Sequence, residues 1–292
     1  MVSPMQRRKA VEMVVCMGLC SRRKACRTLG LQRSTLYHRC EASPEKLAEE
    51  GLVEAVSREL PTLGYEKVAV VLREEHGRKI NRKRVARIRR ERGLKASRKQ
   101  QKRHRIHRSQ SVRRTATRPD EVWSYDFTSD VTVDGRVVRI LSVIDEYTRE
   151  CLLLRAARSF PARRVIAELE EVIGCSGRKP EYLRSDNGPE FIAKIVQEWL
   201  GQAGIGPEYI TPGAPWEHGH VESFHNRLKQ ELLNRELFYS VGEAHMLLCD
   251  WQDFYNHRRP HGSLKMLPPA VAAQREQAAL EAVPAGVNPN NN

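Results

Sequence analysis

The sequence predicts a mixed α/β fold that is preceded by small, strongly basic helical modules. Apolar residues recur at helical spacing up to about residue 94, whereas residues 122–154 show the alternation and the apolar runs of β-strands. The charge also divides near residue 120. Residues 1–120 carry 32 Lys or Arg and 12 acids, and residues 121–292 carry 18 and 24. We therefore expect a basic helical part that meets a polyanion and an acidic α/β part with a different task.

The composition is that of an ordinary globular protein. The chain has 292 residues, a formal net charge of +14 and a mean hydropathy of −0.58, values that do not indicate a disordered chain. The apolar stretch VEMVVCMGLC is short and carries Glu12, so we expect neither a signal peptide nor a membrane span. Seven scattered cysteines, without the paired spacing of a zinc site, fit a reducing cytoplasm.

Residues 1–42 have the outline of a helix-turn-helix module. In SRRKACRTLGLQRSTLYHR a first helix ends at Leu29-Gly30, and a second, polar helix carries Arg33. An ordinary helical hairpin would give the same pattern, because Leu-Gly turns between helices are common.

Residues 43–95 predict a second helix-turn-helix module. Val68, Val71 and Leu72 form an apolar stripe that ends at Gly77, and Asn81 is a good cap for the next helix. From position 82 to 108 there are fourteen Lys or Arg and one acid, a density that favours DNA binding. The expected DNA contacts on this helix are Arg82, Lys83, Arg84, Arg87 and Arg90. Residues 96–118 then read as a basic linker that orders on DNA.

After Pro119 the sequence pattern becomes that of β-strands. In VWSYDF, Trp123, Tyr125 and Phe127 alternate with Val122, Ser124 and Asp126, and Asp134-Gly135 predicts a hairpin. Three strands of an antiparallel meander are expected here, followed by a helix over 161–173 and a short strand over 182–184. A last helix is expected to begin at Pro189 and to bury one face, made of Phe191, Ile192, Ile195, Val196, Trp199 and Leu200.

Three acids occupy positions that are ambiguous one by one. Asp126 lies within an aromatic-rich strand, where an unpaired charge is costly. Asp186 ends a strand in LRSDNGPEF, where Asp-Asn-Gly also reads as a plain turn. Glu222 lies in the first turn of a helix, where acids complement the helix dipole, and Asn226 and Lys229 follow on the same face. A shared cation would explain all three acids at once.

These residues carry a family resemblance. WSYDF, SDNGPEF, a gap of 35 residues between Asp186 and Glu222, and HVESFHNRLK resemble the core of DDE transposases and retroviral integrases. PTLGYEKVA, INRKRVARIRRERGL, YNHRRPHGSL and LPPA resemble, more closely, the second-reading-frame product of the third insertion-sequence family. The resemblance covers roughly residues 20–270. It implies a ribonuclease H-like core with a mixed five-stranded sheet over residues 119–235 and a helical extension over 236–273, while residues 274–292 read as a disordered tail.

The resemblance implies a transposase that cuts and joins DNA strands. Asp126, Asp186 and Glu222 would be the catalytic residues and would hold two Mg²⁺ ions, with Mn²⁺ able to replace them. Lys229 and Asn226 would contact DNA. The expected partners are double-stranded DNA (terminal inverted repeats and target), further copies of the chain and the first-reading-frame product, in the bacterial cytoplasm and nucleoid and without a membrane.

Several alternatives stay open at this point. The chain would bind DNA without cutting it if it were a repressor with an inactive core, or it would cut hybrids or junctions if it were a ribonuclease H-like nuclease. Glu217 is the next candidate for the third ligand. His218 and His225 are expected to support the ligands or to contact DNA rather than to bind Mg²⁺. Trp123, Tyr125 and Trp216 would either stack on bases or pack in the protein.

Overall fold

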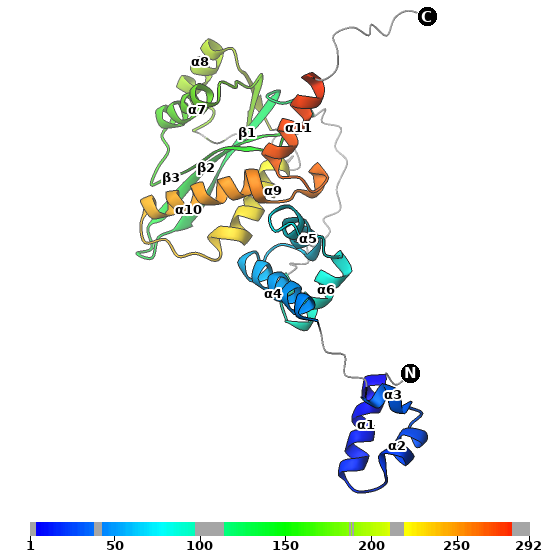
Figure 1. Cartoon of the computed structure of the whole chain (residues 1–292). Coiled ribbons are helices and arrows are strands. Elements are labelled where there is room, and N and C mark those ends of the chain that lie inside the picture. The colour runs from blue at the N-terminus through cyan, green and yellow to red at the C-terminus, as the bar shows by residue number, and fades with distance from the viewer. Residues whose placement is uncertain are drawn as a thin grey trace, which may run out of the picture. The chain divides into compact units, whose positions relative to one another are not determined.

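The computed structural model describes residues 4–37, 43–96, 114–186, 188, 190–210 and 219–281. The chain forms two compact units, residues 1–52 and 53–292. No helix in the described ranges is long and apolar enough to cross a membrane. Figure 1 shows the elements in chain order.

The first unit is a small helical cluster. Its helices are α1 (Pro4–Cys16), α2 (Arg22–Thr28) and α3 (Arg33–Tyr37), and α4 (Pro44–Glu59) begins in this unit. The side chain of Ser21 caps α2, and Gly30 adopts a positive φ of 61° between α2 and α3, a conformation that glycine tolerates. The two helices expected around Gly30 are therefore present.

The second unit begins with the end of α4 and a helix pair, α5 (Tyr65–Glu74) and α6 (Arg82–Glu91). The predicted stripe of Val68, Val71 and Leu72 is buried, and the side chain of Asn81 accepts a hydrogen bond from the backbone of Lys83 at the start of α6. In α6, Val85 and Ile88 are also buried and form a narrow apolar seam on that helix. The helix pair is therefore held by the residues that the pattern indicated.

A mixed five-stranded sheet lies at the centre of this unit, as the expected fold class requires. The strands are β1 (Val122–Val131), β2 (Val137–Asp145), β3 (Cys151–Ala157), β4 (Tyr182–Ser185) and β5 (Gly206–Tyr209). Their order is β3-β2-β1-β4-β5, with β1 to β3 antiparallel and β4 and β5 parallel to β1. The meander was predicted from the strand pattern. The pattern missed β5, which is short, contains Pro207 and forms the sheet edge, where proline is tolerated.

Helices cover both faces of the sheet (Figure 1). One face packs against α7 (Ala162–Ser176) and α8 (Lys194–Ala203). The other packs against α9 (Gly219–Leu228), a π-helical turn (Lys229–Leu233), α10 (Val241–Asp253) and a second π-helical turn (Phe254–Arg258). A 3₁₀ turn (Gly262–Leu264) leads to α11 (Pro269–Glu281).

The start of the helix after Asp186 was predicted wrongly. It begins at Lys194 and not at Pro189, because Phe191 is buried and its ring stacks on that of Phe127 with centroids 5.0 Å apart. This contact holds the chain in a turn before the helix begins. Ile192 and Ile195 are 45% and 37% exposed, so they do not belong to the buried face.

The prediction of a disordered tail from residue 274 was also wrong for its first part. The helix α11 continues to Glu281, because AAQREQAALE consists of strong helix formers without glycine or proline. Residues 282–292 lie outside the described ranges.

Candidate active site

Two of the three acids are placed by neighbouring parallel strands: Asp126 lies on β1, and Asp186 directly follows β4. Ser124 of β1 pairs with Arg184 of β4, and Asp126 and Asp186 each follow two residues later. Because side chains two residues apart share one face of a sheet, both carboxylates emerge on the same face at the same level. This is the face that packs against α9.

The third acid, Glu222, lies in the first turn of α9. The helix is fixed by Val221, Phe224 and Leu228, which are buried against the sheet. Glu222, Asn226 and Lys229 are exposed on another side of the same segment. The helix therefore presents the face that the sequence predicted, although the backbone changes to a π-helical turn at Lys229.

The carboxylates affect one another electrostatically. The pKa of the Asp126 carboxyl is raised to about 7, mainly by burial and in addition by the carboxylates of Asp186 and Glu222. The backbone N–H of Phe127, which donates to Asp126 Oδ1 at 2.7 Å, and the Lys229 ammonium oppose this rise in pKa. Asp186, Glu222 and Lys229 thus all influence the pKa of one group, the carboxyl of Asp126.

His225 lies directly behind Asp126. Its Nδ1 is 3.5 Å from Asp126 Oδ2, its Nε2 is 2.7 Å from Ser142 Oγ, and the side chain is 10% exposed. The ring is therefore placed to orient the carboxylate, which agrees with the expected supporting role and leaves little surface for a DNA contact. His218 and Glu217 lie outside the described residues.

The turn after β4 holds Asp186 closely. The backbone N–H of Gly188 donates to Asp186 Oδ1 at 2.9 Å, and a Cβ at position 188 would also lie 2.9 Å from that oxygen. Any larger residue at this position would push the carboxylate away.

An ion pair that no sequence pattern indicated lies beyond the turn, and we call it the Arg139–Glu190 clamp. Arg139 of β2 donates to Glu190 Oε1 at 2.6 Å, which lowers the pKa of Glu190, and its guanidinium lies over the ring of Phe127 at 4.2 Å. The Glu190 side chain belongs to the motif SDNGPEF, but its partner is 51 residues away. No local pattern connects the two residues.

The donor set suits a hard cation, although the side chains do not yet form a complete set of ligands. Carboxylate oxygens are the groups that Mg²⁺ prefers. Among the residues that the structure describes, no three His, Cys, Asp or Glu side chains lie close enough together to hold a metal ion as they stand. The Gly188 N–H engages Asp186 Oδ1, and the second oxygen of this carboxylate is the one available to a cation.

The predicted DNA contacts are available on the surface. Arg33 of α3 is exposed in the first unit, and in α6 the exposed side chains are Arg82, Lys83, Arg87 and Arg90, with Arg84 partly buried. Most of the basic linker lies outside the described residues. Its last part, from Arg114, packs on the core, where the Arg114 guanidinium lies 3.8 Å from the centroid of the Tyr182 ring.

Two of the proposed base-stacking residues are excluded from that role. Trp123 and Tyr125 are 0% and 1% exposed and belong to the core under α7 and α8. The alternative of packing in the protein is therefore correct for both. Trp216 lies outside the described ranges.

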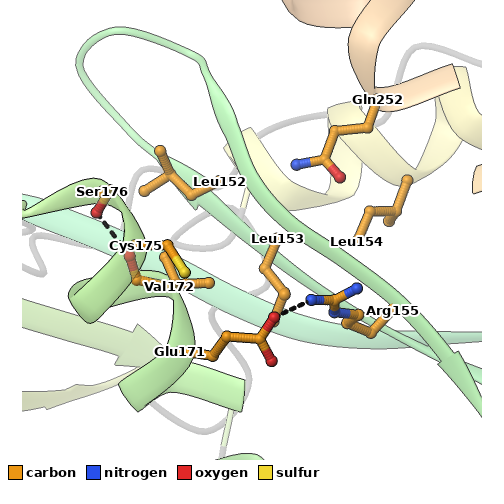
Figure 2. Close-up of a pocket in the computed structure, with 9 residues that line it drawn as sticks. All are labelled: Leu152, Leu153, Leu154, Arg155, Glu171, Val172, Cys175, Ser176 and Gln252. Carbon is orange, nitrogen blue, oxygen red and sulfur yellow. Dashed lines mark hydrogen bonds and ion pairs between the residues drawn. The ribbon is translucent and has the colours of Figure 1, made fainter. Parts of the chain in front are cut away.

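A hollow of about 380 Å³ lies at the sheet edge formed by β3, between α7 and α10. Figure 2 shows Arg155 of β3 turned toward Glu171 of α7. Arg155 also pairs with Glu168 at 3.2 Å, so its charge is already compensated. None of the three acids lines this hollow, and it does not belong to the candidate site.

Models of known families match three parts of the chain. Models described as integrase core domain match residues 116–215 and 203–269. A model described as HTH-like domain matches residues 44–102. The matches to the integrase core include the positions of all three acids, and the HTH-like match includes α5 and α6.

Individual relatives give the same picture. The chain is 30% identical over 285 residues to the 39.2 kDa protein of insertion element IS476 from Xanthomonas euvesicatoria, covering 97% of this chain and 82% of that protein. It is 26% identical over 165 residues to the transposase for insertion sequence element IS629 from Shigella sonnei, covering 56% and 55%. The catalytic core domain of HTLV-2 integrase in complex with magnesium aligns with a TM-score of 0.42 and 18% identity, covering 53% of this chain and 97% of that one.

Proposed function

Because the chain belongs to the second-reading-frame transposases of the third insertion-sequence family, we propose that it cuts and joins DNA strands at the ends of its element. The observation that carries this proposal is the placement of Asp126 and Asp186 on one face of adjacent parallel strands, with Glu222 in electrostatic contact. Asp126, Asp186 and Glu222 are the proposed catalytic residues.

The same three carboxylates are the proposed ligands of two Mg²⁺ ions, with Mn²⁺ as a substitute. Crowded carboxylates whose mutual repulsion raises a pKa are stabilised by a shared cation, and this supports the assignment. When bound, divalent ions would supply activation of the attacking water or 3′-hydroxyl and stabilisation of the leaving oxygen.

The other side chains of the site position the DNA and the ligands. Asp126 would be oriented by His225, which is itself held by Ser142. Lys229 and Asn226 would contact the phosphates next to the cleaved bond, since both are exposed on the side of α9 that carries Glu222. Hydrolysis at an element end would use water as the nucleophile, and strand transfer to target DNA would use a 3′-hydroxyl. The two reactions would otherwise be the same.

The basic helices are proposed to hold the element ends. In α6 the exposed Arg82, Lys83, Arg87 and Arg90 surround a narrow apolar seam, which suits insertion into a groove of double-stranded DNA. Arg33 in α3 would add a second contact. Joining two ends requires two active sites, so we expect at least a dimer on paired-end DNA, together with the first-reading-frame product where the element encodes one.

The first test compares the chain with its Asp186→Asn variant. Duplexes carrying the flanking DNA ends are incubated with Mg²⁺, and cleavage and joining are measured beside DNA binding. We expect the variant to bind DNA like the wild type and to lose activity by at least about 1,000-fold, because an amide is a weak ligand for a hard cation. EDTA should abolish the activity of the wild type.

Other outcomes separate the alternatives. DNA binding by the wild type without any metal-dependent cleavage would favour the repressor. Cutting of hybrids or of any duplex, without preference for an element end, would favour the nuclease. Strand transfer that survives Glu222→Gln would refute that residue as the third ligand and direct attention to Glu217.

A further inference from the structure

A polar hollow of about 460 Å³ opens beside Glu222, between the start of α5 and the exposed side of α9. It is separate from the predicted contacts of α6 and was not indicated by any motif. Its lining combines cationic side chains with groups of the catalytic helix, namely Lys67, Arg227, Arg259, Glu222, Asn226 and Glu231.

One of the three cations has a full set of partners. Arg259 donates to Glu231 from Nε at 2.8 Å and from Nη2 at 2.6 Å, and the two side chains are only 4% and 7% exposed. Its Nη1 lies 3.3 Å from His261 Nε2. Arg259 and Glu231 therefore form a neutral, rigid floor for the hollow.

The other two cations have no carboxylate partner in the described part of the chain. Arg227 donates only to its own helix, to the carbonyl and the hydroxyl oxygen of Ser223 at 3.0 and 2.6 Å. Within the same ranges Lys67 makes neither a hydrogen bond nor an ion pair, although it is only partly exposed. Of the two carboxylates that line the hollow, Glu231 is already engaged by Arg259, and Glu222 forms no ion pair with Lys67 or Arg227 in the described ranges.

This crowding of positive charge is electrostatically unfavourable. The pKa of Lys67 is lowered to about 7, mainly by burial and in addition by Arg259 and Arg227. Burial likewise lowers the pKa of Arg227, and Arg259 adds to that effect. Burial and the same group of cations lower the pKa of His261 to about 2. A bound anion would oppose each of these shifts, because it favours the charged form of every cation near it.

We propose that this hollow binds a backbone phosphate of the DNA strand that reaches the carboxylates, with Lys67 and Arg227 donating to its oxygens. The proposal rests on the proposed function, because a strand held at Glu222 and Asn226 passes over the same hollow. An arginine fork and a lysine ammonium are the groups that bind phosphate in proteins. Since Lys67 belongs to α5 and Arg227 to α9, the phosphate would tie the helix pair to the catalytic core.

The test measures equilibrium binding of an element-end duplex in EDTA over a range of salt concentrations. We expect Lys67→Met to weaken binding about ten-fold and to reduce the slope of log K against log salt by about 0.9, the value for one phosphate contact. Arg227→Gln should act in the same direction, and Lys67→Arg should keep the wild-type slope. The matched control is Lys194→Met, since Lys194 is 89% exposed on α8, and it should bind like the wild type.

A thermal melt of each variant without DNA accompanies the binding curves. Lys67→Met should melt no lower than the wild type, because it removes an uncompensated charge, whereas a purely structural lysine would lower the melting temperature. An unchanged affinity and slope for Lys67→Met, in a wild type that cuts DNA, would overturn the phosphate site and leave the proposed function standing. A reduced slope in a chain that never cuts DNA would support the phosphate site and count against the catalytic proposal. Failure of the wild type to bind the duplex would overturn both.

Discussion

The two faces of the central sheet bury side chains of different kinds. Under α7 and α8 the core is mainly apolar, with Trp123, Leu169 and Phe191 among its members. Under α9 the positions around Asp126 bury hydroxyl, imidazole and charged groups, including Ser142 and His225.

The polar face is also where a buried ion pair lies. Arg184 of β4 and Glu146 are 2% and 1% exposed and bind each other, and Ser124 of β1 donates to the same Glu146 carboxylate. Buried polar groups of this kind cost free energy unless every group is paired. The difference between the faces indicates that one face supplies stability, while the other keeps polar groups that the proposed chemistry needs.

The largest expected effect on stability comes from the apolar face. Leu169→Ala should lower the free energy of unfolding by about 3 kcal/mol, because Leu169 is 1% exposed and the deletion leaves a cavity. Urea denaturation measures this change. Cleavage per folded molecule should stay unchanged, and a selective loss of cleavage would show that the two faces are not independent.

A smaller effect, of the opposite kind, is expected from the polar face. His225→Leu should reduce cleavage about 10- to 100-fold, because Asp126 loses the group that orients it, while stability changes by less than about 1 kcal/mol. The Mg²⁺ concentration for half-maximal cleavage should rise in parallel. Ser142→Ala is the matched variant, since it removes only the partner of the ring, and it should produce a weaker form of the same change.

The proposed difference between the two faces would be refuted if His225→Leu lowered the free energy of unfolding as much as Leu169→Ala and left cleavage per folded molecule intact. His225 would then be an ordinary core residue. Its contacts with Asp126 and Ser142 would have no role in orienting the carboxylate.

Much of this arrangement could be predicted from local patterns. Alternation in VWSYDF assigned Trp123 and Tyr125 to the face opposite Asp126, and helical spacing assigned Val68, Val71 and Leu72 to the apolar stripe of α5. Such patterns report burial wherever one face of an element is covered. They place each carboxylate on an element but cannot measure the distance between elements.

The features that local patterns missed depend on contacts far apart in the chain. The clamp of Arg139 on Glu190 and the hollow formed by Lys67, Arg227 and Arg259 join residues without a shared period. The start of α8 was missed for the same reason, because the packing of Phe191 on Phe127 overrides a local helix signal. A short edge strand such as β5 has too few residues to show alternation.

A third effect, on the pH dependence of stability, tests the charge of the hollow. In the folded chain the pKa of Lys67 is lowered from 10.5 to about 7, so between these pH values the unfolded chain binds one more proton at this position. Stability should therefore rise with pH across this window, by up to about 1.4 kcal/mol per pH unit from Lys67 alone. Below pH 7 both states carry the proton, and the penalty is constant.

Lys67→Met removes this contribution. The free energy of unfolding of the wild type minus that of the variant should therefore rise between pH 7 and pH 10, as measured by urea denaturation at a series of pH values. The titratable and charged groups around Lys67 are Arg227, Arg259, Glu222, Glu231 and His261, and none of them has an ordinary pKa in this window. The exposed Lys194→Met variant should give a curve parallel to that of the wild type. Parallel curves for Lys67→Met as well would mean that the ammonium is fully solvated, and the contrast between a compensated Arg259 and an uncompensated Lys67 would be lost.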